Sequence, residues 1–355
     1  MKMKFIPAAL LAAAAGVVQA DETSGFNLKA GSGITFKSAD GTASFRVGGR
    51  LQWDYDSTDS DISGKSDDFD VRRARIFFQG KYLDWAFKAQ FNLAESGTGG
   101  GSAEDLYLRY TGFGKMARIT VGKQKEPFGF EQLTSSKDIS SLERSALTEF
   151  YAPGRNAGVQ LHGAGDNWTY GLGVFEAAGN GSDDFGNTAI TGRVTYAPIQ
   201  TDDLVLHLGA GFTSRDAALP ANETDAYNIE LAAASGPFHT QAEYFNADTG
   251  GVDVDGYYIQ AGWILTGESR PYSNGVFKRV KPSSSKGAWE AVLRYEDGYG
   301  KFSDVGLGTT EGKQTTVGIN YYPNNAVRLG LSYMDGKQAS GENGKEIRAR
   351  MQIVF

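Results

Sequence analysis

The chain has 355 residues, of which 40% are hydrophobic and 22% are charged, and it carries a formal net charge of −7. Because it contains no cysteine, a disulfide framework, a thiolate metal site and a cysteine nucleophile are excluded. The acidic balance argues against a nucleic-acid partner, and 47 glycines with 12% aromatic residues and few helix signals favour β structure.

The first twenty residues have the features of a secretory signal peptide. Lys2 and Lys4 form a short basic start, residues 5–18 are apolar, and Ala20 ends a small-residue cleavage motif. A membrane anchor is the alternative, but the apolar run is too short to span a bilayer and has no stop-transfer flank. We therefore predict a signal peptide over residues 1–20. No later segment approaches ~18 consecutive apolar residues, so no transmembrane helix is predicted.

Strict alternation of apolar and polar residues begins near residue 43 and recurs to the C-terminus. In residues 45–55 the apolar face includes Trp53 and Tyr55, and the opposite face includes Arg46, Arg50 and Asp54. Successive side chains of a strand point to opposite faces, so such segments are predicted to be two-faced strands. The predicted strands are 43–55, 69–79, 83–93, 103–111, 116–123, 157–163, 168–175, 187–196, 204–213, 226–233, 237–245, 256–266, 287–296, 313–322, 326–334 and 345–355.

The connections between these sixteen segments alternate in length. Those after odd-numbered strands are mostly long and polar, such as 56–68, 176–186 and 297–312, whereas those after even-numbered strands are mostly short. Long loops on one side and tight turns on the other are typical of an outer-membrane barrel. The segment Gly267–Lys286 is an exception, because it is long and basic where a short turn is expected.

A soluble β-sandwich is the alternative to a barrel, since alternation alone does not distinguish a protein core from lipid. Two features favour the barrel. Sixteen strands are more than one ordinary sandwich contains, and the apolar faces repeatedly end in Trp or Tyr, as an aromatic girdle requires. We predict an all-β transmembrane barrel over residues 43–355 and a periplasmic N-terminal segment over 21–42. The barrel would lie in the outer membrane of a Gram-negative bacterium and, at this width, would keep an aqueous channel.

The polar face predicts the charge of the channel wall. Twelve basic residues are expected to face inward: Arg46, Arg50, Arg73, Arg75, Lys88, Arg109, Arg118, Arg193, Arg294, Arg328, Arg348 and Arg350. Eight acidic residues are expected with them: Asp54, Asp84, Asp105, Glu230, Glu243, Glu290, Glu296 and Glu346. Although the chain is acidic overall, the wall is thus predicted to be basic, a distribution that favours anions inside.

No enzyme chemistry is indicated by the sequence. The three histidines, at positions 162, 207 and 239, lie in different predicted strands without metal-ligand spacing. No pairing of a nucleophile with a base is evident, which argues against a barrel enzyme such as an outer-membrane lipase or protease. We predict no catalytic residue, no metal and no cofactor.

Residues 123–156 are the longest stretch without a clear strand, and they follow the fifth predicted strand, where porins commonly place a loop folded into the lumen. Their hydroxyl, lysine and arginine side chains are the donors that an oxyanion needs. An ordinary outer loop with a charged surface is the alternative, but a long ordered loop more often has a task.

The sequence resembles the phosphate- and polyphosphate-selective porin family, porins O and P. The resemblance is carried by residues 45–52 (FRVGGRLQ), 72–74 (RRA), 128–131 (FGFE), 134–137 (TSSK) and 142–144 (LER), with shorter matches near residues 241, 256, 265 and 287 and a final Phe355. This resemblance implies a homotrimer of sixteen-stranded barrels, each with an anion channel narrowed by the third long loop. The long Gly267–Lys286 segment also looks like the family's pattern.

The resemblance also implies a central anion site. Its residues would be Arg50, Arg72, Arg73, Ser135, Ser136, Lys137 and Arg144, with Asp105 as the acidic counterpart. Gln132 stands where the family has a lysine, and Arg75 and Lys125 lie near the expected constriction and would compensate. Alternation places Arg73 and Arg75 inward and Arg72 outward, so either a β-bulge redirects Arg72 or only Arg73 reaches the lumen.

These observations predict an anion-preferring porin for phosphate or related small oxyanions. The alternative is a general small-solute diffusion porin on the same scaffold, because the loops are acidic and the family's outer arginine ladder has almost no counterpart here. The predicted partners are small phosphate-type anions, the lipid bilayer of the outer membrane and two further copies of the chain.

Overall fold

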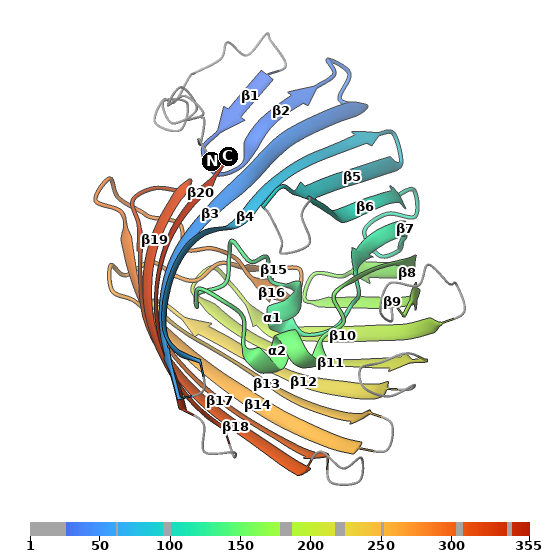
Figure 1. The fold of residues 1–355 in the computed structure, drawn as a ribbon. Helices are drawn as coiled ribbons and strands as arrows, with labels where there is room; N and C mark the ends of the chain where they lie inside the picture. Colours follow the sequence, from blue (N-terminus) through green and yellow to red (C-terminus); the bar gives the residue numbers. More distant parts are fainter. Residues whose placement is uncertain are drawn as a thin grey trace.

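The computed structural model describes residues 26–61, 63–94, 101–177, 187–216, 224–249, 252–302, 308–338 and 343–355. The predicted signal peptide, residues 1–20, lies outside the described residues. Sixteen long strands form one closed antiparallel barrel (Figure 1), which confirms the predicted number of strands. They are β3 (Ala43–Ser60), β4 (Gly64–Tyr82), β5 (Trp85–Asn92), β6 (Ser102–Tyr110), β7 (Arg118–Lys125), β8 (Arg155–Ala164), β9 (Trp168–Glu176), β10 (Thr188–Gln200), β11 (Leu204–Arg215), β12 (Thr224–Ser235), β13 (Phe238–Thr249), β14 (Val252–Ile264), β17 (Ala288–Phe302), β18 (Gly308–Tyr322), β19 (Val327–Gln338) and β20 (Asn343–Val354).

The barrel closes between its last and first strands. Ile353 of β20 is paired with Leu51 of β3, and each barrel strand is antiparallel to its neighbours. Closure leaves no free edge along the wall, so every strand can hydrogen-bond on both sides, as a lipid environment demands.

Several strands extend beyond the predicted boundaries. The predicted loop 56–68 is mostly strand, because β3 continues to Ser60, β4 begins at Gly64, and Asp56 is paired with Asp68. The predicted loop 297–312 is shortened in the same way by β17 and β18. The polar composition marks the level at which these strands leave the apolar belt; backbone pairing continues past that level because it does not need apolar side chains.

The two faces of the wall have the predicted character. Outward residues such as Val194 (56% exposed) and Ile229 (57% exposed) are apolar and uncovered, as a surface facing lipid requires. The charged residues next to them, Arg193 and Glu230, are buried inside the barrel. Outward aromatic rings pair across neighbouring strands, for example Trp289 and Tyr321, whose centroids lie 4.5 Å apart. Among the described residues, no helix is long and apolar enough to cross a membrane.

The predicted list of wall charges needs two corrections. Asp84 lies in the turn between β4 and β5, not in a strand. Glu104 was not expected inside, yet it pairs with Arg75 of the wall, with 2.5 Å between the charged atoms. A bulge explains it: Gln90 of β5 is opposite Asp105, whereas the next residue of β5 is opposite Ala103. The extra residue in β6 changes the alternation at this point.

The N-terminal segment 21–42, predicted without strands, contains the hairpin β1 (Phe26–Lys29) and β2 (Gly33–Lys37). Ile34 of β2 pairs with Val47 of β3, directly beyond the last β20 pair, Val354 with Arg50. The hairpin thus covers the part of β3 that β20 is too short to reach. Figure 1 shows it beside the C-terminal end of the chain, at one end of the barrel.

Two segments lie inside the ring of strands (Figure 1). The first, residues 126–154 between β7 and β8, contains α1 (Phe130–Leu133) and α2 (Ala146–Tyr151) and is called the constriction loop below. The second is Gly267–Lys286, which contains β15 (Tyr272–Ser273) and β16 (Val276–Phe277) and is called the inner hairpin. They fill much of the lumen, and two of the barrel's buried apolar clusters lie between them and the wall.

Candidate functional site

The constriction loop is packed against the inside of the wall, so the prediction that this segment folds inward is confirmed. Phe128 contacts Phe245 and Tyr258 of the wall, and Phe130 contacts Phe277 of the inner hairpin. Both phenylalanine side chains are almost completely buried. Apolar anchors of this kind favour the inward position, because an outer position would leave the rings in water.

Charged wall residues bind the backbone and hydroxyl groups of the constriction loop. Glu243 accepts hydrogen bonds from the backbone N–H groups of Phe130 and Glu131, at 2.7 and 2.9 Å. Glu296 accepts from the hydroxyl and following N–H at Ser145, which caps α2. On the opposite side of the loop, Arg328 donates to carbonyl oxygens. Many inward charges predicted to face water are therefore used to hold this loop, because buried polar groups require partners.

The carboxylate of Glu143, in the constriction loop, binds three arginine side chains of the wall. Arg73 approaches it with two parallel hydrogen bonds of 2.8 Å, and Arg72 and Arg350 bind it as well. Burial opposes ionisation of this carboxyl, but the bonds and charges of the three arginines outweigh it. They hold the pKa of Glu143 well below its usual range. Glu143 is therefore ionised at neutral pH and ties the loop to β4 and β20.

A bulge brings Arg72 to this carboxylate. Gln52 of β3 is opposite Arg73 of β4, and Asp54 is opposite Asp70. Between these two pairs β3 advances by two residues and β4 by three, so β4 contains one extra residue. The extra residue allows Arg72 and Arg73 to reach the same carboxylate, although the Arg72 side chain remains 43% exposed. Of the two alternatives for Arg72, the structure has the bulge.

The inner hairpin accounts for the anomalous length of residues 267–286. Arg270 is buried between Glu290 of the wall and the backbone oxygen of Asp138 in the constriction loop. Tyr272 is hydrogen-bonded to His207, and Arg193 donates to the backbone oxygen of Gly275. The segment therefore supports the constriction loop and contributes its tip, Asn274, to the wall of the larger cavity.

Two adjoining cavities lie in the lumen formed by the described residues. The larger has a volume of about 430 Å³ and extends along β6–β9 to the end of the barrel with the short turns. The smaller, about 250 Å³, lies along β2–β5. Both are lined by Arg50, Lys88, Gln90 and Ser135. These four residues mark the junction of the open space with the constriction loop.

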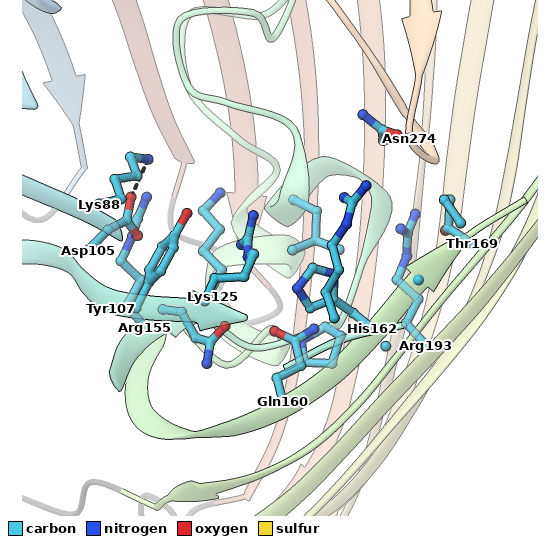
Figure 2. A pocket seen from close by; sticks show the side chains of 18 of the residues that line it. Lys88, Asp105, Tyr107, Lys125, Arg155, Gln160, His162, Thr169, Arg193 and Asn274 are labelled. Atoms are coloured by element: carbon cyan, nitrogen blue, oxygen red, sulfur yellow. Dashed lines mark hydrogen bonds and ion pairs between the residues drawn. The ribbon is translucent and has the colours of Figure 1, made fainter. Parts of the chain in front are cut away.

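The cations at this junction differ in their pairing. Lys88 and Arg155 share Asp105, with distances of 2.6 and 2.7 Å, as Figure 2 shows for Lys88. Arg50 donates to the hydroxyl of Ser135 at 3.0 Å, and Lys125 donates to the backbone oxygen of Gln132. In the part of the chain that the structure describes, neither Arg50 nor Lys125 forms an ion pair with a carboxylate. Their positive charges are available to an anion.

The predicted site residues therefore separate into two groups. One group lines the cavities: Arg50, Arg75, Asp105, Lys125, Ser135 and Lys137. The other group, Arg72, Arg73, Ser136 and Arg144, lines neither cavity. Arg144 donates to the backbone oxygens of Glu131 and Thr134 and so shapes the loop. The side chain of Gln132 is also buried and donates to the backbone oxygen of Pro153, while the backbone oxygen of Gln132 accepts a hydrogen bond from the ammonium group of Lys125.

Arg155 was missed from the sequence, and Lys88, Arg109, Arg118 and Arg193 were expected in the wall but not at the site. All five line the larger cavity. Arg155 is the first residue of β8 and is opposite Lys125 in register, so it stands where the constriction loop returns to the wall. Its place at the end of a strandless stretch is the only signal that could have indicated it. Among the described residues, no group of three or more His, Asp or Glu is arranged to hold a metal ion.

A closed sixteen-stranded barrel with an apolar belt, an inward-folded loop and charged lumen cavities defines an outer-membrane porin. The chain belongs to the family of phosphate-selective porins O and P, whose family model matches residues 45–226 and 216–355. The chain is 28% identical to Porin O of Pseudomonas aeruginosa over 92% of each protein. It is thus an integral outer-membrane channel protein.

Solved structures share the fold at low identity. An anion-selective porin from Comamonas acidovorans has a TM-score of 0.65 at 15% identity, covering 88% of this chain and all of that one. OmpF of Salmonella typhi, solved with daunomycin, has a TM-score of 0.65 at 11% identity, covering 90% of this chain and all of that one. These structures support the barrel architecture.

Proposed function

We propose that the channel prefers anions and binds phosphate or a related small oxyanion at the junction of the two cavities. The residues that would contact the anion are Arg50, Lys125 and Ser135, with Lys88 and Arg155 adding positive charge around them. A guanidinium fork, an ammonium group and a hydroxyl together can replace part of the hydration shell of a tetrahedral oxyanion.

The observation that carries this proposal is the pairing pattern of the lumen. Most of the buried arginines that contact the constriction loop or the inner hairpin have carboxylate partners, for example Arg193 with Glu230 and Arg350 with Asp54. Arg50 and Lys125 face open space without such a partner among the described residues. Two of the similar proteins support the proposal: the matching family is described as phosphate-selective, and the porin from Comamonas acidovorans is described as anion-selective.

A general small-solute diffusion porin is the second candidate. It is favoured by Glu104 and Asp105, which neutralise Arg75, Lys88 and Arg155 next to the junction. Lys137 is likewise paired with Asp138. If these pairs leave too little net positive charge in the lumen, chloride and phosphate would pass without a specific site.

Planar-bilayer recording distinguishes the two candidates. In a potassium chloride gradient, we expect a reversal potential of the sign given by anion preference, and we expect added phosphate to reduce the chloride current. The reason is that a doubly charged oxyanion gains more than chloride from converging donors. A cation-selective reversal potential would contradict anion preference. An anion-selective channel whose chloride current is insensitive to phosphate would support the general porin.

We also infer that the protein assembles as a homotrimer, as its family resemblance implies. OmpT of Vibrio cholerae, a structural neighbour with a TM-score of 0.56, has been solved in a form described as a trimer. On a denaturing gel, an unheated sample in mild detergent is expected to migrate near three chain masses and a boiled sample at 38.1 kDa or below, since the precursor contains the predicted signal peptide. Migration of the unheated sample as a folded monomer would contradict the trimer.

A further inference from the structure

A second group of basic side chains lies in the larger cavity, near the short turns. Arg109 of β6, Arg118 of β7 and His162 of β8 all line this part of the cavity. The sheet register makes them neighbours, because Arg109 is opposite Thr120 and Arg118 is opposite His162. The buried hydroxyl of Thr120 joins them, at 2.9 Å from both Arg109 Nε and His162 Nε2.

The two arginines of this group differ from most arginines of the lumen. Arg193, Arg294, Arg348 and Arg350 each have a carboxylate partner. In the described ranges of the chain, Arg109 has no carboxylate partner; it donates to the Thr120 hydroxyl and lies 4.9 Å from the ring of Tyr107. The side chain of Arg118 forms no hydrogen bond or ion pair with a described residue. Two guanidinium groups therefore face the cavity without a compensating negative charge.

The larger cavity leaves room for a ligand beside them, because Arg109, Arg118 and His162 all line its open space of about 430 Å³. Gly171 of β9 is opposite His162 on one side and Arg193 on the other, so β9 places no side chain in this row. The position is closely packed rather than empty, since a Cβ added to Gly171 would lie 2.7 Å from Gln160 Nε2 and 2.8 Å from Pro127 Cβ. Figure 2 shows His162, Gln160 and Tyr107 along this wall. Gly171 and the two guanidinium groups line the same open space.

We propose that Arg109, Arg118 and His162 form a second oxyanion site, on the short-turn side of the constriction. The inference rests on the proposed function, since it adds a second anion-binding site to the same permeation pathway. Arg109 is four residues along β6 from Asp105, which at 3.3 Å per residue is roughly 13 Å. The two groups of residues therefore lie at different levels of the lumen. Conduction requires that a bound ion can leave its site, and a second site of moderate affinity next to the first makes this easier.

The test compares phosphate block of chloride current from the two sides of a planar bilayer. Phosphate added on the short-turn side reaches the second site first, so we expect a component of block with shallow voltage dependence in addition to the steeper one from the constriction. Arg118→Gln is expected to raise the half-blocking phosphate concentration of the shallow component about three- to tenfold, since one charged hydrogen-bond donor is lost in a partly hydrated site. Block from the long-loop side is expected to stay unchanged.

Arg46→Gln is the matched control. Arg46 lines the smaller cavity near the same end of the barrel, and the substitution removes the same charge. Arg118→Lys, which keeps the charge but not the fork, is expected to give a smaller shift than Arg118→Gln. Heat-dependent gel mobility verifies that each variant is folded.

Three results would overturn the second site. The first is block of the unmutated channel with a single, steeply voltage-dependent component. The second is an unchanged half-blocking phosphate concentration in Arg118→Gln. The third is an equal shift of that concentration in Arg118→Gln and Arg46→Gln, which would indicate that the overall electrostatic field of the lumen controls block. Failure of the proposed function is distinguishable, because phosphate would then fail to block the unmutated channel from the long-loop side too.

Discussion

Replacing Arg50 with alanine is expected to raise the phosphate concentration that half-blocks chloride current by about ten- to a hundredfold. Arg50 lies at the junction of the two cavities, and in the described part of the chain its guanidinium bonds only the Ser135 hydroxyl. A hydrogen bond to a charged group contributes about 1.5–3 kcal/mol, which corresponds to that range of affinity. Titration of phosphate into single-channel recordings measures the effect.

The control for Arg50→Ala is Lys65→Ala. Lys65 lies at the start of β4, its side chain is 84% exposed, and the substitution removes the same charge from the same molecule. It is expected to leave the half-blocking concentration unchanged within twofold, because exposed charges are screened by salt. Equal effects of the two substitutions would show that the field of the whole protein, and not a site at Arg50, controls phosphate block.

Glu143→Gln is expected to release the constriction loop from the wall. The substitution leaves Arg73 buried with only the Gln52 side chain and a neutral amide as partners. Removing one member of a buried ion pair costs about 3–5 kcal/mol. We therefore expect a lower thermal unfolding temperature, a larger single-channel conductance and a loss of phosphate block. Glu149→Gln is the control, since the side chain of Glu149 is 56% exposed and, among the described residues, forms its ion pair with Arg144 alone.

Acid is expected to reproduce the effect of Glu143→Gln. The pKa of Glu143 in the folded protein lies well below the value of about 4.5 expected when unfolded. Its stabilising contribution is therefore complete above pH ~4.5 and is lost as the pH falls through the folded pKa. Conductance of the unmutated channel is expected to stay constant from pH 7 to pH 5 and to rise only in stronger acid. A rise between pH 7 and pH 5 would mean that another group controls the loop.

The sequence could predict the barrel because each strand carries its own evidence. Alternation is local, so residues 45–55 alone predict a strand with one lipid face and one lumen face. Where an extra residue enters a strand, the rule fails, as at Arg72 in β4 and Glu104 in β6. A bulge depends on the pairing of two strands, and no alternation pattern within one strand contains that information.

The site was only partly predictable for a related reason. Sequence reasoning identified Arg50, Lys125 and Ser135, which line the cavities, but it placed Arg73 and Arg144 with them. In the structure these two arginines bind Glu143, Glu149 and loop carbonyl groups. Whether an inward arginine faces water or a carboxylate depends on where the constriction loop crosses the lumen, and that path is set by packing of Phe128 and Phe130 against distant strands.

The sequence by itself thus determined the sixteen barrel strands, the two faces of the wall and one of the two segments that enter the lumen, the constriction loop, because period-two alternation and loop length are properties of neighbouring residues. Only the tertiary structure decided which charges remain free. Pairing of Arg350 with Asp54, of Arg270 with Glu290 and of Arg155 with Asp105 joins residues that are far apart in the chain. Electrostatic partners are selected by distance in space, so the charge that an anion meets in this channel arises only when the barrel closes around its loop.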